Sequence, residues 1–238
     1  MQGNATLREV IQILFSNNVV IGTDINDAWR NVLWCIARNG YSYVIEKGSY
    51  ENEVRKQVDK LMVVIEEPGK RPLAPFMPGG SGIPAPATEE SIHQYFKEYI
   101  MGIEDDRSDK EDYKYSDFIM TQIDDVIKCL KVSNGNTNQA CITIGNEFST
   151  KLKDPPCLKV IDFKVVNKKL NCSVYFRSWD IFAAFPVNIG GLQLLKEYVL
   201  LHLDNIEDGN IFAYSAGAHI YEMYFDIVNM LNVDKIKI

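Results

Sequence analysis

The chain has 238 residues, of which 46% are apolar and 24% charged, and its formal net charge is −7. This much apolar material supports a sizeable core and excludes a disordered chain. The acidic balance argues against binding to a nucleic acid polymer, because a basic surface supplies most of the affinity for one.

Cysteine usage points to a reducing environment. The five cysteines are an odd number and form no C-x-x-C pair, so neither a disulfide framework nor a zinc site is expected. The first twenty residues carry no signal-peptide pattern, and no apolar run is long enough to span a bilayer. We therefore expect a soluble cytoplasmic protein with no membrane segment and no bound metal.

The first half of the chain alternates between helical and extended patterns. Helical spacing of apolar residues predicts helices over 6–17 and 24–39, and β-branched and aromatic runs predict strands over 41–45 and 60–66. Proline and glycine dominate residues 67–87, which predicts a long loop. Two further helices, over 88–101 and 116–131, are expected on either side of a charged connection over 104–114.

The second half is richer in strands. A buried strand is predicted over 139–145, and two runs around Asn167-Lys168-Lys169 predict a hairpin in which Ser173, Tyr175 and Arg177 share one face. A long apolar helix over 187–203, a strand over 210–221 and a helix over 222–231 complete the chain. There is no strict βαβ alternation and no clear boundary, so we expect a mixed α+β layer structure forming a single domain over 1–238.

Four short motifs of the second half carry chemistry when they are taken together. They are Pro-Pro-Cys at 155–157, Arg-Ser-Trp-Asp at 177–180, Phe-Pro-Val-Asn at 185–188 and His-Ile-Tyr at 219–221. Singly, each has an ordinary structural explanation, since a lone cysteine is usually a small core residue and an asparagine before a helix is usually a cap. In this order and at these spacings they resemble the thymidylate synthase family from about residue 138 to 225.

The resemblance, which is greater to the archaeal-type members than to the bacterial ones, implies a fold and a function. It implies a three-layer α+β fold in which helices pack a large mixed sheet. It also implies a homodimer that transfers a one-carbon unit to C5 of a pyrimidine nucleotide. The expected co-substrate is methylene-tetrahydrofolate or a tetrahydromethanopterin analogue.

The family's motifs imply roles for the residues around the cysteine. Cys157 would add to C6 of the pyrimidine ring and so turn C5 into a nucleophile. Arg177 would contact the nucleotide phosphate and lower the pKa of the thiol, and Ser178 would also bind the phosphate. Tyr115 stands where the family has a Tyr-Gly pair, although Ser116 replaces the glycine.

Further roles follow for the last motifs. Asp180 would hold the pterin ring, and Asn188 would hydrogen-bond O4 and N3 of the base. His219 and Tyr221 would hydrogen-bond the 3′-hydroxyl of the sugar.

Some family positions are occupied differently in this sequence. The family's proton-relaying glutamate is assigned to Glu98, with Glu89 and Glu90 as alternatives. Lys47 takes the place of an arginine on an N-terminal loop.

The arginine pair that a partner subunit usually supplies to the phosphate is replaced by Asn138 and Gln139. Because charged hydrogen bonds are about twice as strong as neutral ones, we expect a weaker grip on the phosphate.

These features leave three functions open. The first is methylation of deoxyuridylate to thymidylate. The second is hydroxymethylation of a cytidine or uridine nucleotide. Only seventeen residues follow Tyr221, and a short tail would exclude water less well, whereas Asn188 suits uracil and a deoxycytidylate hydroxymethylase is expected to carry an aspartate there. The third is a nucleotide-binding relative without activity, although such a protein would have no use for a nucleophilic cysteine.

Overall fold

The computed structural model describes residues 18–48, 50–79, 82–103 and 112–232. The helix predicted over 6–17 and most of the charged connection over 104–114 lie outside these residues. One mixed sheet of eight strands runs through the described part, in the order β1-β3-β8-β6-β5-β4, with β2 paired to β3 and β7 to β8. The strands are β1 (Val19–Gly22), β2 (Tyr41–Val44), β3 (Val54–Ile65), β4 (Cys141–Thr143), β5 (Leu158–Val166), β6 (Lys169–Phe176), β7 (Trp179–Asp180) and β8 (Glu207–Tyr221).

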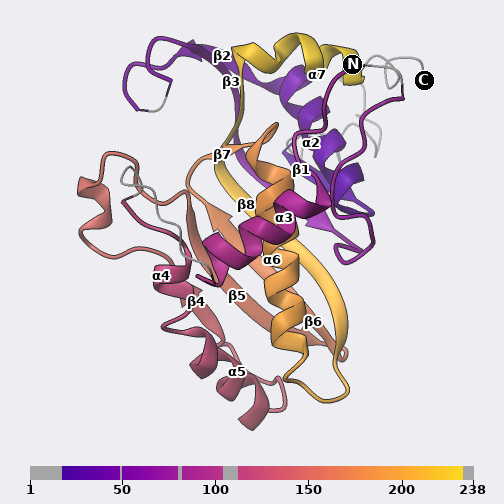
Figure 1. Ribbon diagram of the computed structural model, residues 1–238, viewed down its shortest axis with the longest axis vertical. Coiled ribbons are helices and arrows are strands. Elements are labelled where there is room, and N and C mark those ends of the chain that lie inside the picture. The colour runs from indigo at the N-terminus through magenta and orange to yellow at the C-terminus, as the bar shows by residue number, and fades with distance from the viewer. Residues whose placement is uncertain (1–17, 49, 80–81, 104–111, 233–238) are drawn as a thin grey trace, which may run out of the picture.

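The helices are packed mainly against one face of this sheet. They are α2 (Ile25–Asn39), α3 (Glu89–Tyr95), α4 (Ser116–Ile119), α5 (Ile123–Val132), α6 (Ala184–Leu200) and α7 (Phe225–Asn232). Figure 1 shows α6 in front of the long strands and α3 crossing in front of α6. The three layers and the mixed sheet confirm the predicted α+β fold class.

Helix α6 is the centre of these layers, as its apolar sequence predicts. Twelve of its residues are buried, including Asn188 and the fully enclosed Gln193 and Lys196. A helix that is buried on nearly all sides needs small residues where another helix crosses it closely. Gly190 and Gly191 meet this need, because a Cβ at Gly191 would lie 2.7 Å from the ring of Tyr95.

Most predicted elements are confirmed, and some differ in extent. The hairpin forms between β5 and β6, with Asn167 and Lys168 in the left-handed conformation that a tight turn needs. The strand predicted from residue 60 begins earlier, at Val54. The helix predicted over 88–101 begins after the Thr88 cap but ends in a π-helical turn, η1 (Phe96–Ile100).

Three elements depart further from the sequence pattern. The helix predicted over 116–131 is interrupted between Ile119 and Ile123 and forms α4 and α5. Strand β1 and the two-residue β7 were not predicted. Each is too short to show a periodic pattern, and each is held by pairing with a longer strand, β1 with β3 and β7 with β8.

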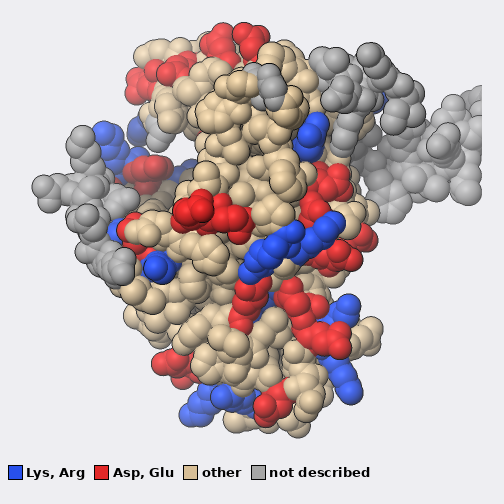
Figure 2. Space-filling model, turned by 45° about the vertical axis from the view of Figure 1, so that its right-hand side comes forward, with Lys and Arg blue, Asp and Glu red and all other residues tan. Residues whose placement is uncertain are grey.

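Lysine, arginine, aspartate and glutamate are interspersed on the molecular face shown in Figure 2, with no single basic area there. Among the helices described, none is long and apolar enough to cross a membrane.

Candidate functional site

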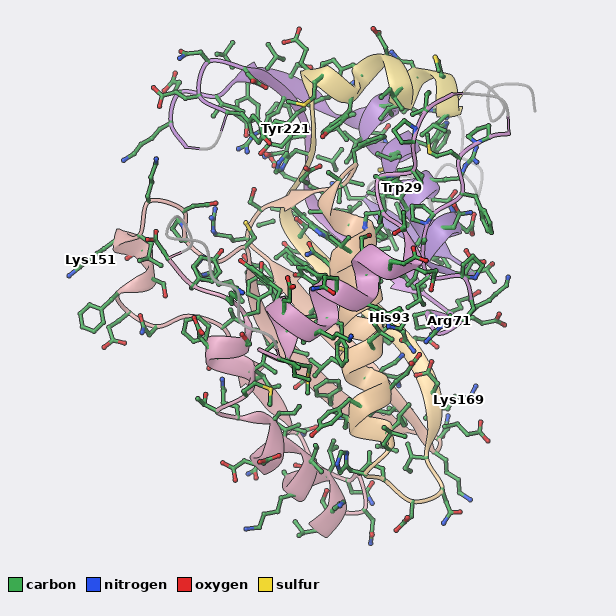
Figure 3. The ribbon with its side chains drawn as sticks, viewed as in Figure 1. Trp29, Arg71, His93, Lys151, Lys169 and Tyr221 are labelled. Carbon is green, nitrogen blue, oxygen red and sulfur yellow. The ribbon has the colours of Figure 1, made fainter. Side chains whose placement is uncertain are left out.

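The sheet topology brings the sequence motifs to one region. Because β5 and β6 are antiparallel, the start of β5 lies beside the end of β6, and Leu158 pairs with Phe176. Strand β8 runs parallel to β6 and β7 and carries His219 beside Asp180. Cys157 directly precedes β5, so these strand ends place the thiol close to the Arg177 and His219 motifs. Tyr221 is seen in Figure 3 at the end of β8.

Arg177 holds the turn that leads to Cys157. Its Nε donates a hydrogen bond to the carbonyl oxygen of Pro156 at 3.1 Å, and its Nη2 donates to the carbonyl oxygen of Pro155. Its backbone N–H donates to the carbonyl oxygen of Cys157 at 2.8 Å, and Nη2 lies 3.4 Å from Oδ1 of Asp154. One arginine therefore contacts four consecutive residues and fixes the position of the thiol.

The surroundings of Cys157 act on its pKa in opposite directions. Burial of the thiol is the largest influence and raises the pKa of Cys157 above its ordinary value, while the positive charge of Arg177 opposes this shift. Lys159 and Arg55 lower it further, while Asp154 raises it. Among the charges that lower the pKa of Cys157, that of Arg177 has the largest effect.

Four tyrosines form a connected cluster, and the charge of Cys157 is among the influences that raise the pKa of three of them, Tyr95, Tyr113 and Tyr115. Tyr95 stacks on Tyr99 with ring centroids 5.3 Å apart, and Tyr99 meets Tyr115 edge-on at 5.0 Å. The hydroxyl oxygen of Tyr115 accepts a hydrogen bond from the backbone N–H of Leu158 at 3.2 Å. Tyr113 lies beside Tyr115. Burial raises the pKa of Tyr95 and Tyr115 well above 10, so both hydroxyls are neutral.

Asn188 connects this tyrosine cluster to the core. Its Oδ1 accepts a hydrogen bond from the indole Nε1 of Trp179 at 3.1 Å, and its Nδ2 donates to the hydroxyl oxygen of Tyr95 at 2.9 Å. An indole N–H can only donate, so Oδ1 of the amide faces Trp179 and Nδ2 faces Tyr95.

His219 presents a hydrogen-bond acceptor to the site. Its Nδ1 lies 3.4 Å from the carbonyl oxygen of Gly217, which identifies Nδ1 as the donor and Nε2 as the acceptor. The Nε2 atom is buried and has no partner among the described residues. Burial, helped by the nearby charge of Arg55, lowers the pKa of His219 to about 4. A buried neutral acceptor suits a ligand hydroxyl group.

Asp180 and Ser178 lie in the segment that connects β6 to α6. Oδ1 of Asp180 accepts hydrogen bonds from the backbone N–H groups of Phe182 at 3.0 Å and Ala183 at 3.2 Å. Burial raises the pKa of Asp180 to about 6, despite these two donors. Ser178 is half-buried in the bend after Arg177.

Comparisons with known proteins identify the family of the chain. The family model described as Thymidylate synthase matches residues 97–235, more than half of the chain. A protein of Methanosarcina mazei named "Putative thymidylate synthase" is 31% identical over 218 residues, which cover 88% of this chain and 92% of that protein.

This chain belongs to the thymidylate synthase family.

More distant relatives share the same description or the same fold. A protein of Methanothermobacter thermautotrophicus with the same name is 27% identical over 216 residues, covering 85% of this chain and 92% of its own length. The structure of thermostable thymidylate synthase A from Bacillus subtilis matches with a TM-score of 0.65 at 15% identity, over 88% of this chain and 84% of that one. The family is one of enzymes that transfer a one-carbon unit to C5 of pyrimidine nucleotides, with a folate-type co-substrate.

The structure does not bring the glutamates assigned to the family's proton relay to Asn188. Glu98 accepts a hydrogen bond from Gln94 of the same helix, and Glu89 accepts one from the backbone N–H of Ala74 at 2.6 Å. Glu90 is exposed in the first turn of α3. The side chain from this helix that reaches Asn188 is Tyr95. The apolar spacing around Glu98 favoured this residue, but residues 96–100 form a π-helical turn, which departs from the regular 3.6-residue spacing.

Arg55 is a cation of the site that the sequence did not reveal. It pairs across the sheet with Tyr221, and its Nε donates a hydrogen bond to the hydroxyl oxygen of Tyr43. Its charge lowers the pKa of Cys157 and of His219. Lys47, the cation expected from the sequence, is exposed in the connection between β2 and β3. The apolar pattern predicts the strand only from residue 60, whereas β3 begins at Val54 and so includes Arg55.

Two other expectations concern the phosphate and metals. Asn138 and Gln139, which replace the family's arginine pair, are both exposed, and Asn138 accepts a hydrogen bond from Lys164. Within the described residues there is no group of three or more His, Cys, Asp or Glu side chains that could hold a metal ion.

The buried neutral state of His219 predicts a pH dependence of stability. Between its ordinary value of 6.5 and its folded value of about 4, the unfolded chain binds a proton that the folded chain does not. The free energy of unfolding therefore falls as the pH decreases through this range. Relative to a His219→Gln variant, the wild type is expected to lose about 3 kcal/mol between pH 7 and pH 4.

Chemical denaturation of both proteins at several pH values measures this difference. Asp180, whose raised pKa acts in the opposite direction, is present in both proteins and cancels in the comparison. A difference that stayed constant from pH 7 to pH 4 would contradict the burial of a neutral His219.

Proposed function

We propose that this chain methylates deoxyuridylate to thymidylate, with methylene-tetrahydrofolate or a tetrahydromethanopterin analogue as the one-carbon donor. The observation that supports this most directly is the grip of Arg177 on the turn before Cys157. This contact holds Cys157, one of five cysteines, beside the positive charge of Arg177. Asn188 and His219, which are suited to hydrogen-bond a base and a sugar, belong to the same site. A protein that only bound nucleotides would need no such arrangement.

Cys157 supplies the nucleophile in this proposal. Addition of its sulfur to C6 of the ring forms a C–S bond and moves the electron pair of the C5–C6 double bond toward C5 and O4. C5 then becomes nucleophilic and attacks the methylene carbon of the reduced pterin, whose bond to a pterin nitrogen breaks. Loss of the C5 proton, a hydride from the pterin and departure of the Cys157 sulfur from C6 complete the methyl group and restore the ring. The positive charge of Arg177 favours the thiolate, and the fixed turn reduces the entropy lost in reaching the reactive geometry.

The nucleotide is held by groups at its base, sugar and phosphate. Asn188 hydrogen-bonds the base, and Nε2 of His219 accepts a hydrogen bond from the sugar 3′-hydroxyl, assisted by Tyr221. The phosphate is bound by Arg177, Ser178 and Arg55 in this proposal. Their hydrogen bonds and charges offset in part the loss of the family's arginine pair. Lys47 stays a prediction for the same role.

Asp180 and Tyr115 complete the set. One oxygen of Asp180 is occupied by backbone N–H groups, and the other is left to hold the pterin ring. The pKa of Asp180 of about 6 lies close to neutrality. Tyr115 fixes the entry to β5 through its bond to Leu158, directly beside the nucleophile.

A covalent trap tests the proposal. Incubation with 5-fluorodeoxyuridylate and methylene-tetrahydrofolate should give a stable adduct on Cys157, detected by intact-protein and peptide mass spectrometry. The Cys157→Ser variant should form none, because a hydroxyl is a much weaker nucleophile than a thiolate. Cys141→Ser removes another half-buried cysteine and should leave the adduct unchanged.

The same assay separates the alternatives. A nucleotide product heavier by one oxygen than thymidylate would identify a hydroxymethylase, and tritium release from C5 of labelled uridine or cytidine nucleotides identifies the base. If no adduct formed with any pyrimidine nucleotide and any reduced pterin, the enzymatic proposal would fail and a binding role would remain.

We also propose that two copies of the chain pair through the sheet face opposite the helices. On this face an apolar row crosses five strands in register, formed by Val160, Tyr175, Tyr214, Met62 and Val19. Met62 is 44% exposed and Val19 is 46% exposed. An extended apolar area of this kind is typical of a protein interface.

Phe212 lies next to this row, on the central strand β8, and is 37% exposed. A Phe212→Arg substitution should bury an unpaired charge in the paired sheets and separate them. Analytical ultracentrifugation should then show the mass fall from twice 27.1 kDa to that of one chain. Leu201→Arg, at an exposed residue at the end of α6, should leave the mass unchanged. A monomeric wild type would contradict the proposal.

A further inference from the structure

We propose that the hydroxyl group of Tyr95 is a hydrogen-bond donor to O4 of the pyrimidine ring, acting beside Asn188, and that this pair of donors selects a 4-oxo over a 4-amino pyrimidine. This proposal rests on the proposed function. It assigns to Tyr95 the position near O4 for which the sequence suggested a proton-relaying glutamate.

The position of Tyr95 is fixed from three sides. Its ring stacks on Tyr99 and lies against Gly191, where any Cβ would come within 2.7 Å of the ring. Its hydroxyl oxygen lies 2.9 Å from Nδ2 of Asn188. The close crossing of α3 over α6 thus places this hydroxyl beside the amide that faces the base.

The direction of each hydrogen bond follows from Trp179. Because the indole can only donate, Oδ1 of Asn188 is the acceptor for Trp179, and Nδ2 is the donor to Tyr95. The hydroxyl oxygen of Tyr95 is therefore an acceptor in this bond, and its own hydrogen is left to donate. In the part of the chain that the structure describes, this hydroxyl makes no other hydrogen bond.

The hydrogen bonds from Trp179 to Asn188 and from Asn188 to Tyr95 leave two donor groups side by side. They are the O–H of Tyr95 and the second N–H of Asn188. Burial and the neighbouring Tyr99 keep the Tyr95 hydroxyl protonated, since both raise its pKa well above 10. The charge of Cys157 also contributes to the raised pKa of Tyr95, so the two side chains belong to the same region of the molecule.

Two donors suit the chemistry of a 4-oxo ring. When the sulfur of Cys157 bonds to C6, negative charge develops on O4, and a hydrogen bond from each donor stabilises it without transferring a proton. A 4-amino group presents hydrogens to both donors, so that two buried donors would lose their partners. Such a mismatch is what allows a polar site to reject an analogue strongly.

The test is Tyr95→Phe, which keeps the ring stacking and the contact with Gly191 and removes only the hydroxyl. Tritium release from C5 of labelled deoxyuridylate should fall by about tenfold to a hundredfold, mainly in kcat with a smaller change in KM. Tyr198→Phe, which removes a tyrosine hydroxyl on α6 that takes no part in the proposed site, should leave the rate unchanged.

Binding measurements distinguish this proposal from the function on which it rests. By calorimetry, the wild type should bind deoxyuridylate more tightly than deoxycytidylate, and Tyr95→Phe should lose about tenfold of this preference. If the wild type released tritium and Tyr95→Phe matched it in rate and base preference, Tyr95 would be only a packing residue and the proposal would be overturned.

Other outcomes are also decisive. If the preference for the 4-oxo base depended on Tyr95 but no nucleotide released tritium, the recognition would stand and the enzymatic function would fail. If the wild type bound the two nucleotides equally, the donor pair would not select the base, and the proposal would be overturned.

Discussion

The contact on which the site depends is the one between Arg177 and the two prolines before Cys157. Pro155 and Pro156 restrict the backbone and leave two carbonyl oxygens that no helix or strand satisfies. The guanidinium group of Arg177 donates a hydrogen bond to each of these oxygens, and the backbone N–H of Arg177 donates one to the carbonyl oxygen of Cys157. Because Arg177 stands at the end of β6, the hairpin with β5 fixes both partners at once. The thiol is thereby set directly before β5, a strand that is paired on both sides, and beside a positive charge.

Burial governs the rest of the site. It raises the pKa of Asp180, lowers that of His219 and keeps the tyrosines neutral. Where the base and the sugar are expected to bind, the result is a set of fixed neutral donors and acceptors: an imidazole nitrogen for a hydroxyl, and an amide and a phenol for a carbonyl. Such prearranged dipoles stabilise a developing charge without having to reorient during the reaction.

The sequence predicted the parts of this site that lie in compact motifs. Cys157, Arg177, Asn188 and His219 occur at family spacings within strands and a helix whose patterns are clear. The hairpin and α6 were confirmed for the same reason. Tyr95 and Arg55 could not be predicted in this way. The close crossing of α3 over α6, which brings Tyr95 to Asn188, depends on two glycines of α6, and Arg55 reaches the site only through the pairing of β3 with β8. Both depend on contacts between distant segments, which local spacing does not record.

The central claim is that Arg177 positions and activates Cys157, and the pH dependence of Cys157 alkylation tests it most directly. The rate with iodoacetamide, followed for the Cys157 peptide by mass spectrometry, should give a higher apparent pKa in Arg177→Leu than in the wild type, by about one pH unit or more. Arg177→Lys, which keeps the charge but cannot contact both prolyl carbonyls in the same way, should lie between them. An alkylation profile that was the same in all three proteins would contradict the account.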